Sequence, residues 1–93
     1  MTDSTRLAHL LDRYATALAL HLGTVREEFQ GLERAWAALS DVYEGDAAEQ
    51  FRDVFGHSAA RMHRYETDAD RMLTLLRARL ETLREFDAPH PTL

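Results

Sequence analysis

The sequence contains no cysteine, lysine, isoleucine or asparagine, and it has only two prolines and four glycines among 93 residues. Without cysteine, neither a disulfide framework nor a thiolate metal site can form. Pro89 and Pro91 both lie near the C-terminus, where they end any helix that precedes them. All eleven basic residues are arginine, a bias that suits a GC-rich bacterial genome.

The chain also lacks the marks of a membrane, Sec-exported or nucleic-acid-binding protein. The N-terminus has no basic segment, and the apolar run from Leu18 to Leu22 is interrupted by His21, so we expect neither a Sec-type signal peptide nor a membrane span. The net charge is −5, and five carboxylates gather near the middle of the sequence around the single base Arg52. This acidic segment would repel a phosphate backbone, so we expect no binding to nucleic acid.

No pattern of catalytic or metal-ligating residues is found. The serines are not set in a Gly-x-Ser-x-Gly elbow, and no glycine-rich phosphate loop precedes a helix. Two histidines can chelate a metal from one helix face only when they stand three or four residues apart. No two of the five histidines have that spacing. These are His9, His21, His57, His63 and His90. We therefore expect no enzyme activity, no cofactor and no metal.

Apolar residues recur every three or four positions in two long segments, which is the period of one helix face. The first stripe contains Leu7, Leu11, Tyr14, Leu18, Leu22, Val25, Phe29, Leu32, Trp36 and Leu39. The second contains Phe51, Phe55, Ala59, Met62, Tyr65, Ala69, Met72, Leu76, Leu80 and Leu83. The pattern predicts one all-α domain over 1–93, with helices at about 4–42 and 46–86, a turn at 43–45 and a tail at 87–93. A break at Gly23-Thr24, giving three helices, is the alternative.

The turn between the two stripes is centred on Gly45. Glycine takes positive φ at no steric cost, and Asp46 followed by Glu49 has the Asp-x-x-Glu spacing of a helix start. The sequence therefore predicts an antiparallel helical hairpin.

Each stripe is broader than the contact between two helices requires, because several of its positions are doubled by an apolar neighbour. Two hairpins paired into a four-helix bundle would bury the full width of both stripes. The alternative is a single hairpin in which the extra apolar residues only cover its edge. We expect a dimer. The predicted partner interface consists of Leu11, Leu18, Leu22, Phe29, Trp36, Phe55, Met62, Met72 and Leu76.

The turn resembles that of the WXG superfamily, the small helical hairpins associated with type VII (ESX-like) secretion in actinobacteria and Firmicutes. Members carry Trp-x-Gly at the turn, then small residues and an aromatic residue. Tyr43-Glu44-Gly45, Ala47-Ala48 and Phe51 are similar to that pattern, with tyrosine in place of tryptophan. The family's Tyr-x-x-x-Asp/Glu export motif is not found in plain form, since Ala69 stands four residues after Tyr65.

The resemblance implies a binding protein with Tyr43, Gly45 and Phe51 as its turn motif. It would pair with itself, with a WXG-like paralogue or with the N-terminal helical domain of an effector. It would be cytoplasmic before export as a dimer, or act as an adaptor for a secreted toxin, and a type VII secretion ATPase would recognise the pair. The rival interpretation is a cytoplasmic structural or regulatory bundle subunit unrelated to secretion.

Overall fold

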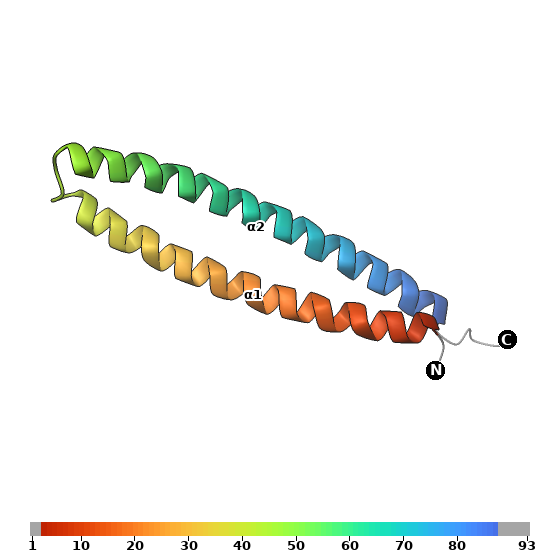
Figure 1. Cartoon of the computed structure of the whole chain (residues 1–93). Helices are drawn as coiled ribbons and strands as arrows, with labels where there is room; N and C mark the ends of the chain where they lie inside the picture. The colour runs from red at the N-terminus through yellow and green to blue at the C-terminus, as the bar shows by residue number, and fades with distance from the viewer. Residues whose placement is uncertain (1–2, 88–93) are drawn as a thin grey trace.

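The computed structural model describes residues 3–87, which form two long helices joined by one short turn (Figure 1). Helix α1 spans Asp3–Ser40 and α2 spans Asp46–Asp87. The two helices run antiparallel and lie side by side along their whole length (Figure 1). The predicted all-α helical hairpin is thus confirmed. The predicted tail, with its two prolines, lies outside the described residues apart from Asp87.

Helix α1 continues through Gly23, so the three-helix alternative is wrong. An interior glycine costs a helix only about 1 kcal/mol relative to alanine, and the unbroken apolar stripe outweighs that cost. The helix ends at Ser40, two residues before the predicted end. Backbone amides of Val42 and Tyr43 both bond to the carbonyl of Leu39, at 3.1 and 2.9 Å, and these bonds close the last turn.

The turn has the predicted glycine geometry. Gly45 has a φ of 105°, a conformation that a side chain would strain, and its carbonyl accepts the first bond of α2, from the amide of Glu49 at 3.1 Å. Gly45 therefore stands at the N-cap position, and Asp46 and Glu49 place their negative charges in the first turn of α2.

Arg52 fastens the two sides of this turn together. Its Nη2 donates to the carbonyl oxygens of Ser40 at 3.1 Å and Tyr43 at 2.7 Å, and its Nη1 pairs with Glu49 at 2.8 Å. Carbonyls at a helix C-terminus have no partner within the helix, and a guanidinium supplies one. A side chain of α2 therefore caps the end of α1.

The core of the hairpin follows a seven-residue repeat. On α1 the buried residues are Ala15, Leu22 and Phe29, and on α2 they are Ala48, Ala69, Leu73, Leu80 and Leu83. Repeats of seven keep one seam of each helix facing the other. The molecule measures 75 × 22 × 17 Å and has a radius of gyration of 21.0 Å. A compact domain of this length would have a radius of gyration of about 12 Å, so the hairpin is a rod with a thin core.

Candidate interaction surface

The seam between the helices separates two long sides of the hairpin, and one of them carries the ion pairs between α1 and α2. Arg26 contacts both Glu66, at 3.6 Å, and Asp70. Glu33 lies 3.7 Å from His63, and Asp12 lies 3.6 Å from Arg84. The α1 members of these pairs, at 12, 26 and 33, are separated by multiples of seven residues and so lie on one edge of the helix. We call this the ion-paired side.

The opposite side, which we call the apolar side, holds nearly all the large hydrophobic side chains that are exposed. These are Leu7, Leu10, Tyr14, Leu32, Leu39, Phe51, Val54, Tyr65, Met72, Leu75 and Phe86. Of the other two in the described part of the chain, Leu20, 70% exposed, lies elsewhere on α1, and Val42, 78% exposed, lies in the turn. Soluble monomers rarely expose so many large apolar side chains along one side. The apolar side is therefore the candidate site for a partner.

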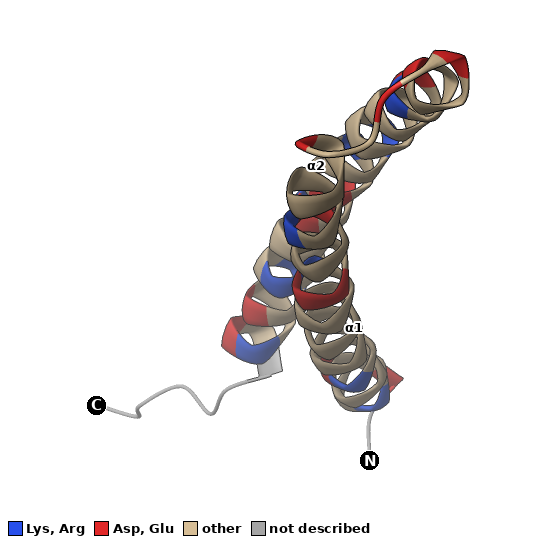
Figure 2. Ribbon diagram, turned by 90° about the vertical axis from the view of Figure 1, so that its left-hand side faces the viewer, with Lys and Arg blue, Asp and Glu red and all other residues tan. Residues whose placement is uncertain are grey.

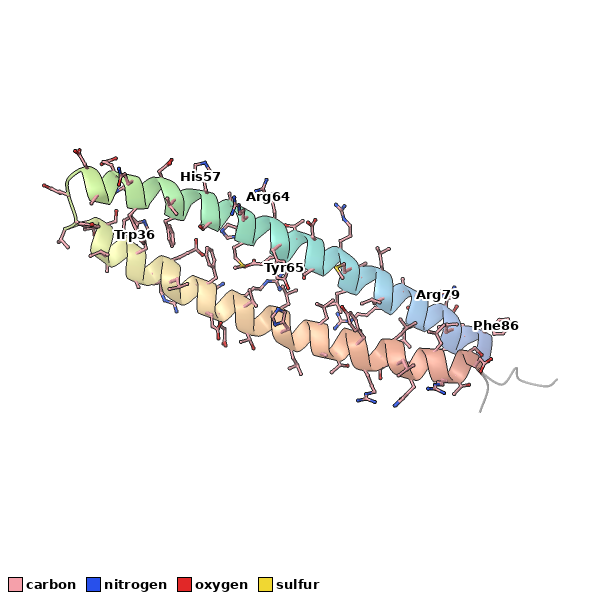
Figure 3. All side chains as sticks on the ribbon, in the orientation of Figure 1. Trp36, His57, Arg64, Tyr65, Arg79 and Phe86 are labelled. Atoms are coloured by element: carbon pink, nitrogen blue, oxygen red, sulfur yellow. The ribbon has the colours of Figure 1, made fainter. Side chains whose placement is uncertain are left out.

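A groove opens on the apolar side near the turn. It has a volume of about 190 Å³ and is lined by Leu32, Ala35, Trp36, Leu39, Phe51 and Phe55. Its floor is aromatic, with ring centres 4.7 Å apart for Trp36 and Phe51 and 5.6 Å apart for Trp36 and Phe55. Figure 3 shows Trp36 pointing from α1 toward α2. Such aromatic grooves are the usual anchor points of protein interfaces.

The middle of the apolar side contains a polar pair. Nε2 of His21 lies 3.1 Å from the hydroxyl oxygen of Tyr65, and the two rings meet edge to face with their centres 6.4 Å apart. Figure 3 shows Tyr65 reaching across from α2. Both side chains are exposed at their level of the hairpin, so this pair would be covered by whatever covers the apolar side.

The predicted interface residues divide into three groups. Leu22 and Phe29 are buried in the hairpin's own core and offer little surface to a partner. Met72, 47% exposed, lies on the apolar side. The others are half-buried at the seam between the helices: Leu11, Leu18, Trp36, Phe55, Met62 and Leu76. The sequence did not separate these groups, because one broad stripe contains all of them.

The structure brings the predicted turn motif together with Arg52, to which the sequence analysis gave no role. Tyr43 is half-buried, Gly45 has the positive φ, and Phe51 forms a wall of the groove. Arg52, noted in the sequence only as a lone base, holds the Tyr43 carbonyl and lies over Trp36, with its guanidinium carbon 6.0 Å from the ring centre. The sequence offers only a weak signal for this role, a lone arginine in the first turns of a helix that follows an acidic turn.

Charge is also distributed unevenly along the rod. Residues 41–53 contain five carboxylates and one arginine, and Figure 2 shows the acidic residues at the turn. At the open end, residues 3–9 and 79–86 contain three acidic residues and three arginines. The two ends of the hairpin thus differ by about four units of charge.

Within residues 3–87, no group of three His, Asp or Glu side chains is placed to hold a metal ion. In the same part of the chain, neither helix has a stretch apolar enough to cross a bilayer. Comparison with protein-family models, with curated proteins and with solved structures gives no match to this chain.

Proposed function

We propose that this chain is a binding protein that pairs through its apolar side with another helical hairpin to form a four-helix bundle, and that the pair serves type VII secretion. In that role it is either exported as a dimer or escorts a secreted effector. The one observation that carries the pairing is the division of the hairpin into two sides: ion pairs between α1 and α2 lie on one, and the exposed apolar residues lie on the other.

The surface area supports pairing. The chain exposes 7477 Å² of accessible surface, whereas a compact monomer of this mass would expose about 5500 Å². The surplus of about 2000 Å² per chain is within the area that each partner loses in a large, permanent interface, which buries about 2000–5000 Å² in total. A second hairpin laid along the apolar side would therefore bring the exposed surface per chain toward that of an ordinary globular protein.

The secretion role rests on the turn. Tyr43, Gly45 and Phe51 resemble the WXG turn motif, and the positive φ of Gly45 gives a physical reason for glycine at this position. The carboxylates around this turn are exposed, and they would give a secretion ATPase a charged end of the rod to contact.

The experiment that tests the proposal measures export and pairing in the same cells. The tagged chain is expressed in a GC-rich actinobacterium that has a type VII system, and in a strain from which the secretion ATPase has been deleted. We expect the chain in the culture filtrate of the first strain only. Equal amounts in both filtrates, or none in either when candidate partner genes are co-expressed, would contradict the secretion role.

Pairing is tested separately with two leucine variants. Leu32 is 60% exposed on the apolar side and Leu20 is 70% exposed away from it, so L32R and L20R introduce the same charge at similarly exposed helix positions. We expect L32R to abolish pairing and export, and L20R to leave both unchanged. If L32R pairs as well as the unaltered chain, the apolar side is not the binding surface.

The cytoplasmic structural subunit is the second candidate. It uses the same apolar side for packing and differs only in having no route out of the cell. The filtrate experiment separates the two, because a structural subunit stays in the cells of both strains.

A further inference from the structure

A pocket opens on the ion-paired side of the hairpin, near the end where the two helices are not joined. Its volume is about 440 Å³. The residues that line it are Asp12, Ala15, Thr16, Arg77, Leu80, Glu81 and Arg84. The seven-residue repeat of α1 explains its position, because Ala15 occupies the seam where Leu22 and Phe29 stand at the next two levels. The small side chain leaves space between the helices.

The pocket has an apolar floor and a charged rim. Ala15 and Leu80, on opposite helices, are both buried. On the rim, a carboxylate oxygen of Asp12 lies 3.6 Å from a guanidinium nitrogen of Arg84, so these two charges offset each other. An apolar centre within a polar rim is the usual anatomy of a protein interface.

Two other charged side chains of the rim, Arg77 and Glu81, are unpaired. Within residues 3–87, neither one forms an ion pair or a hydrogen bond. They stand four residues apart on α2 but do not pair with each other, and a base before an acid is the less favourable order for such a pair on a helix. The rim therefore offers one free cation and one free anion, about 6 Å apart along the helix axis.

The hydroxyl group of Thr16, across the pocket on α1, is also free. Thr24, Thr67, Thr74 and Thr82 each donate a hydrogen bond to the carbonyl oxygen four residues earlier in their helix. In the described part of the chain, the Thr16 hydroxyl makes no hydrogen bond of this or any other kind. It can therefore donate to a ligand or accept from one.

We propose that this pocket is a second docking site, for a helix of another protein that presents one acidic and one basic side chain a single turn apart. The acidic side chain pairs with Arg77 and accepts a hydrogen bond from Thr16. The basic side chain pairs with Glu81. This goes beyond the proposed function, because the pocket lies on the side of the hairpin that pairing through the apolar side leaves open.

The charges of the rim decide the kind of partner. Two arginines and two carboxylates line the pocket, so a phosphate group gains no net attraction there. A partner with one charge of each sign satisfies both Arg77 and Glu81. Side chains four residues apart on a second helix have the same spacing along the axis as these two, so a helix that lies along the groove between α1 and α2 brings both charges into reach.

Peptide binding tests the site. The probes are three capped, alanine-based helical peptides that carry, at two positions four residues apart, Glu and Lys, two Glu, or two Lys. Each is titrated at physiological ionic strength into the isotope-labelled full chain, and the NMR signals of Thr16 and Arg77 are followed. We expect the mixed peptide to bind at least about threefold more tightly than either of the others, since only it makes two attractive contacts.

Single charge reversals are expected to change which peptide is preferred. R77E leaves two acidic side chains at these positions, so we expect the peptide with two Lys to bind best. E81R leaves two basic ones, so we expect the peptide with two Glu to bind best. R64E is the matched control, because Arg64 and Asp68 are exposed on α2 with the same spacing and order but do not line the pocket. It is expected to keep the preference for the mixed peptide.

Three results would overturn the site. They are equal affinity for the three peptides, binding that leaves the signals of Thr16 and Arg77 unmoved, and the same change of preference in R64E as in R77E. The last would show that charge acts along the whole rod and not at the pocket.

The variant L32R separates this inference from the proposed function. Leu32 lies on the apolar side, so L32R is expected to bind the mixed peptide within about twofold of the unaltered chain. Loss of peptide binding in L32R would place the peptide on the apolar side and overturn the inference. Failure of pairing or export, with peptide binding intact, would overturn the proposed function alone.

Discussion

Nη2 of Arg52 donates a hydrogen bond of 2.7 Å to the backbone carbonyl oxygen of Tyr43, so the second helix holds the aromatic residue of the turn in place. The same nitrogen bonds the Ser40 carbonyl at the end of α1. One side chain therefore ties the acidic turn to the end of α1, beside the groove formed by Trp36 and Phe51.

We expect the variant R52M to be less stable than the unaltered chain. It keeps the apolar stem of the side chain but leaves the carbonyls of Ser40 and Tyr43 without this donor. Hydrogen bonds to charged groups contribute about 1.5–3 kcal/mol each, and partial exposure reduces that, so we expect a loss of about 1–3 kcal/mol. Thermal unfolding followed by circular dichroism measures it. R71M, on an exposed part of α2, is the control, and an equal loss in both variants would contradict the role of Arg52.

Glycine substitutions are expected to have opposite effects at the turn and within the helices. Gly45 has a φ of 105°, so G45A strains the backbone and lowers the free energy of unfolding by about 1 kcal/mol. Gly56 lies inside α2, and a methyl group there meets nothing within 4 Å, so G56A raises the free energy of unfolding by about 0.5–1 kcal/mol. Urea titration of the two variants compares them directly. A stabilising G45A would show that the turn conformation differs in solution.

The variants L32R and L20R are expected to differ in pairing but not in helicity. Burying a leucine contributes about 1.5–3 kcal/mol, so L32R is expected to weaken pairing at least about tenfold. L20R lies off the apolar side and is expected to change the dissociation constant by less than threefold. Sedimentation equilibrium gives both constants. Equal weakening by the two variants would point to a general effect of added charge.

The turn illustrates how far local sequence predicts this structure. A glycine between two periodic segments, followed by two acidic residues, was enough to place the turn and the start of α2 at Asp46. The end of α1 was predicted two residues late, because Val42 continues the apolar pattern while the chain already turns. The clamp by Arg52 was missed, since its partners are backbone carbonyls, which sequence patterns do not show.

The sequence by itself determined the two helices, their turn and their antiparallel course, because the helical period and the conformational freedom of glycine act over a few neighbouring residues. Only the tertiary structure decided which apolar residues are core and which are surface. Leu22 and Leu32 belong to one stripe, yet the first is 2% exposed and the second 60%. The difference arises from the rotation of each helix about its axis. That rotation is set by packing between residues distant in the sequence, such as Phe29 with Phe55 across the seam.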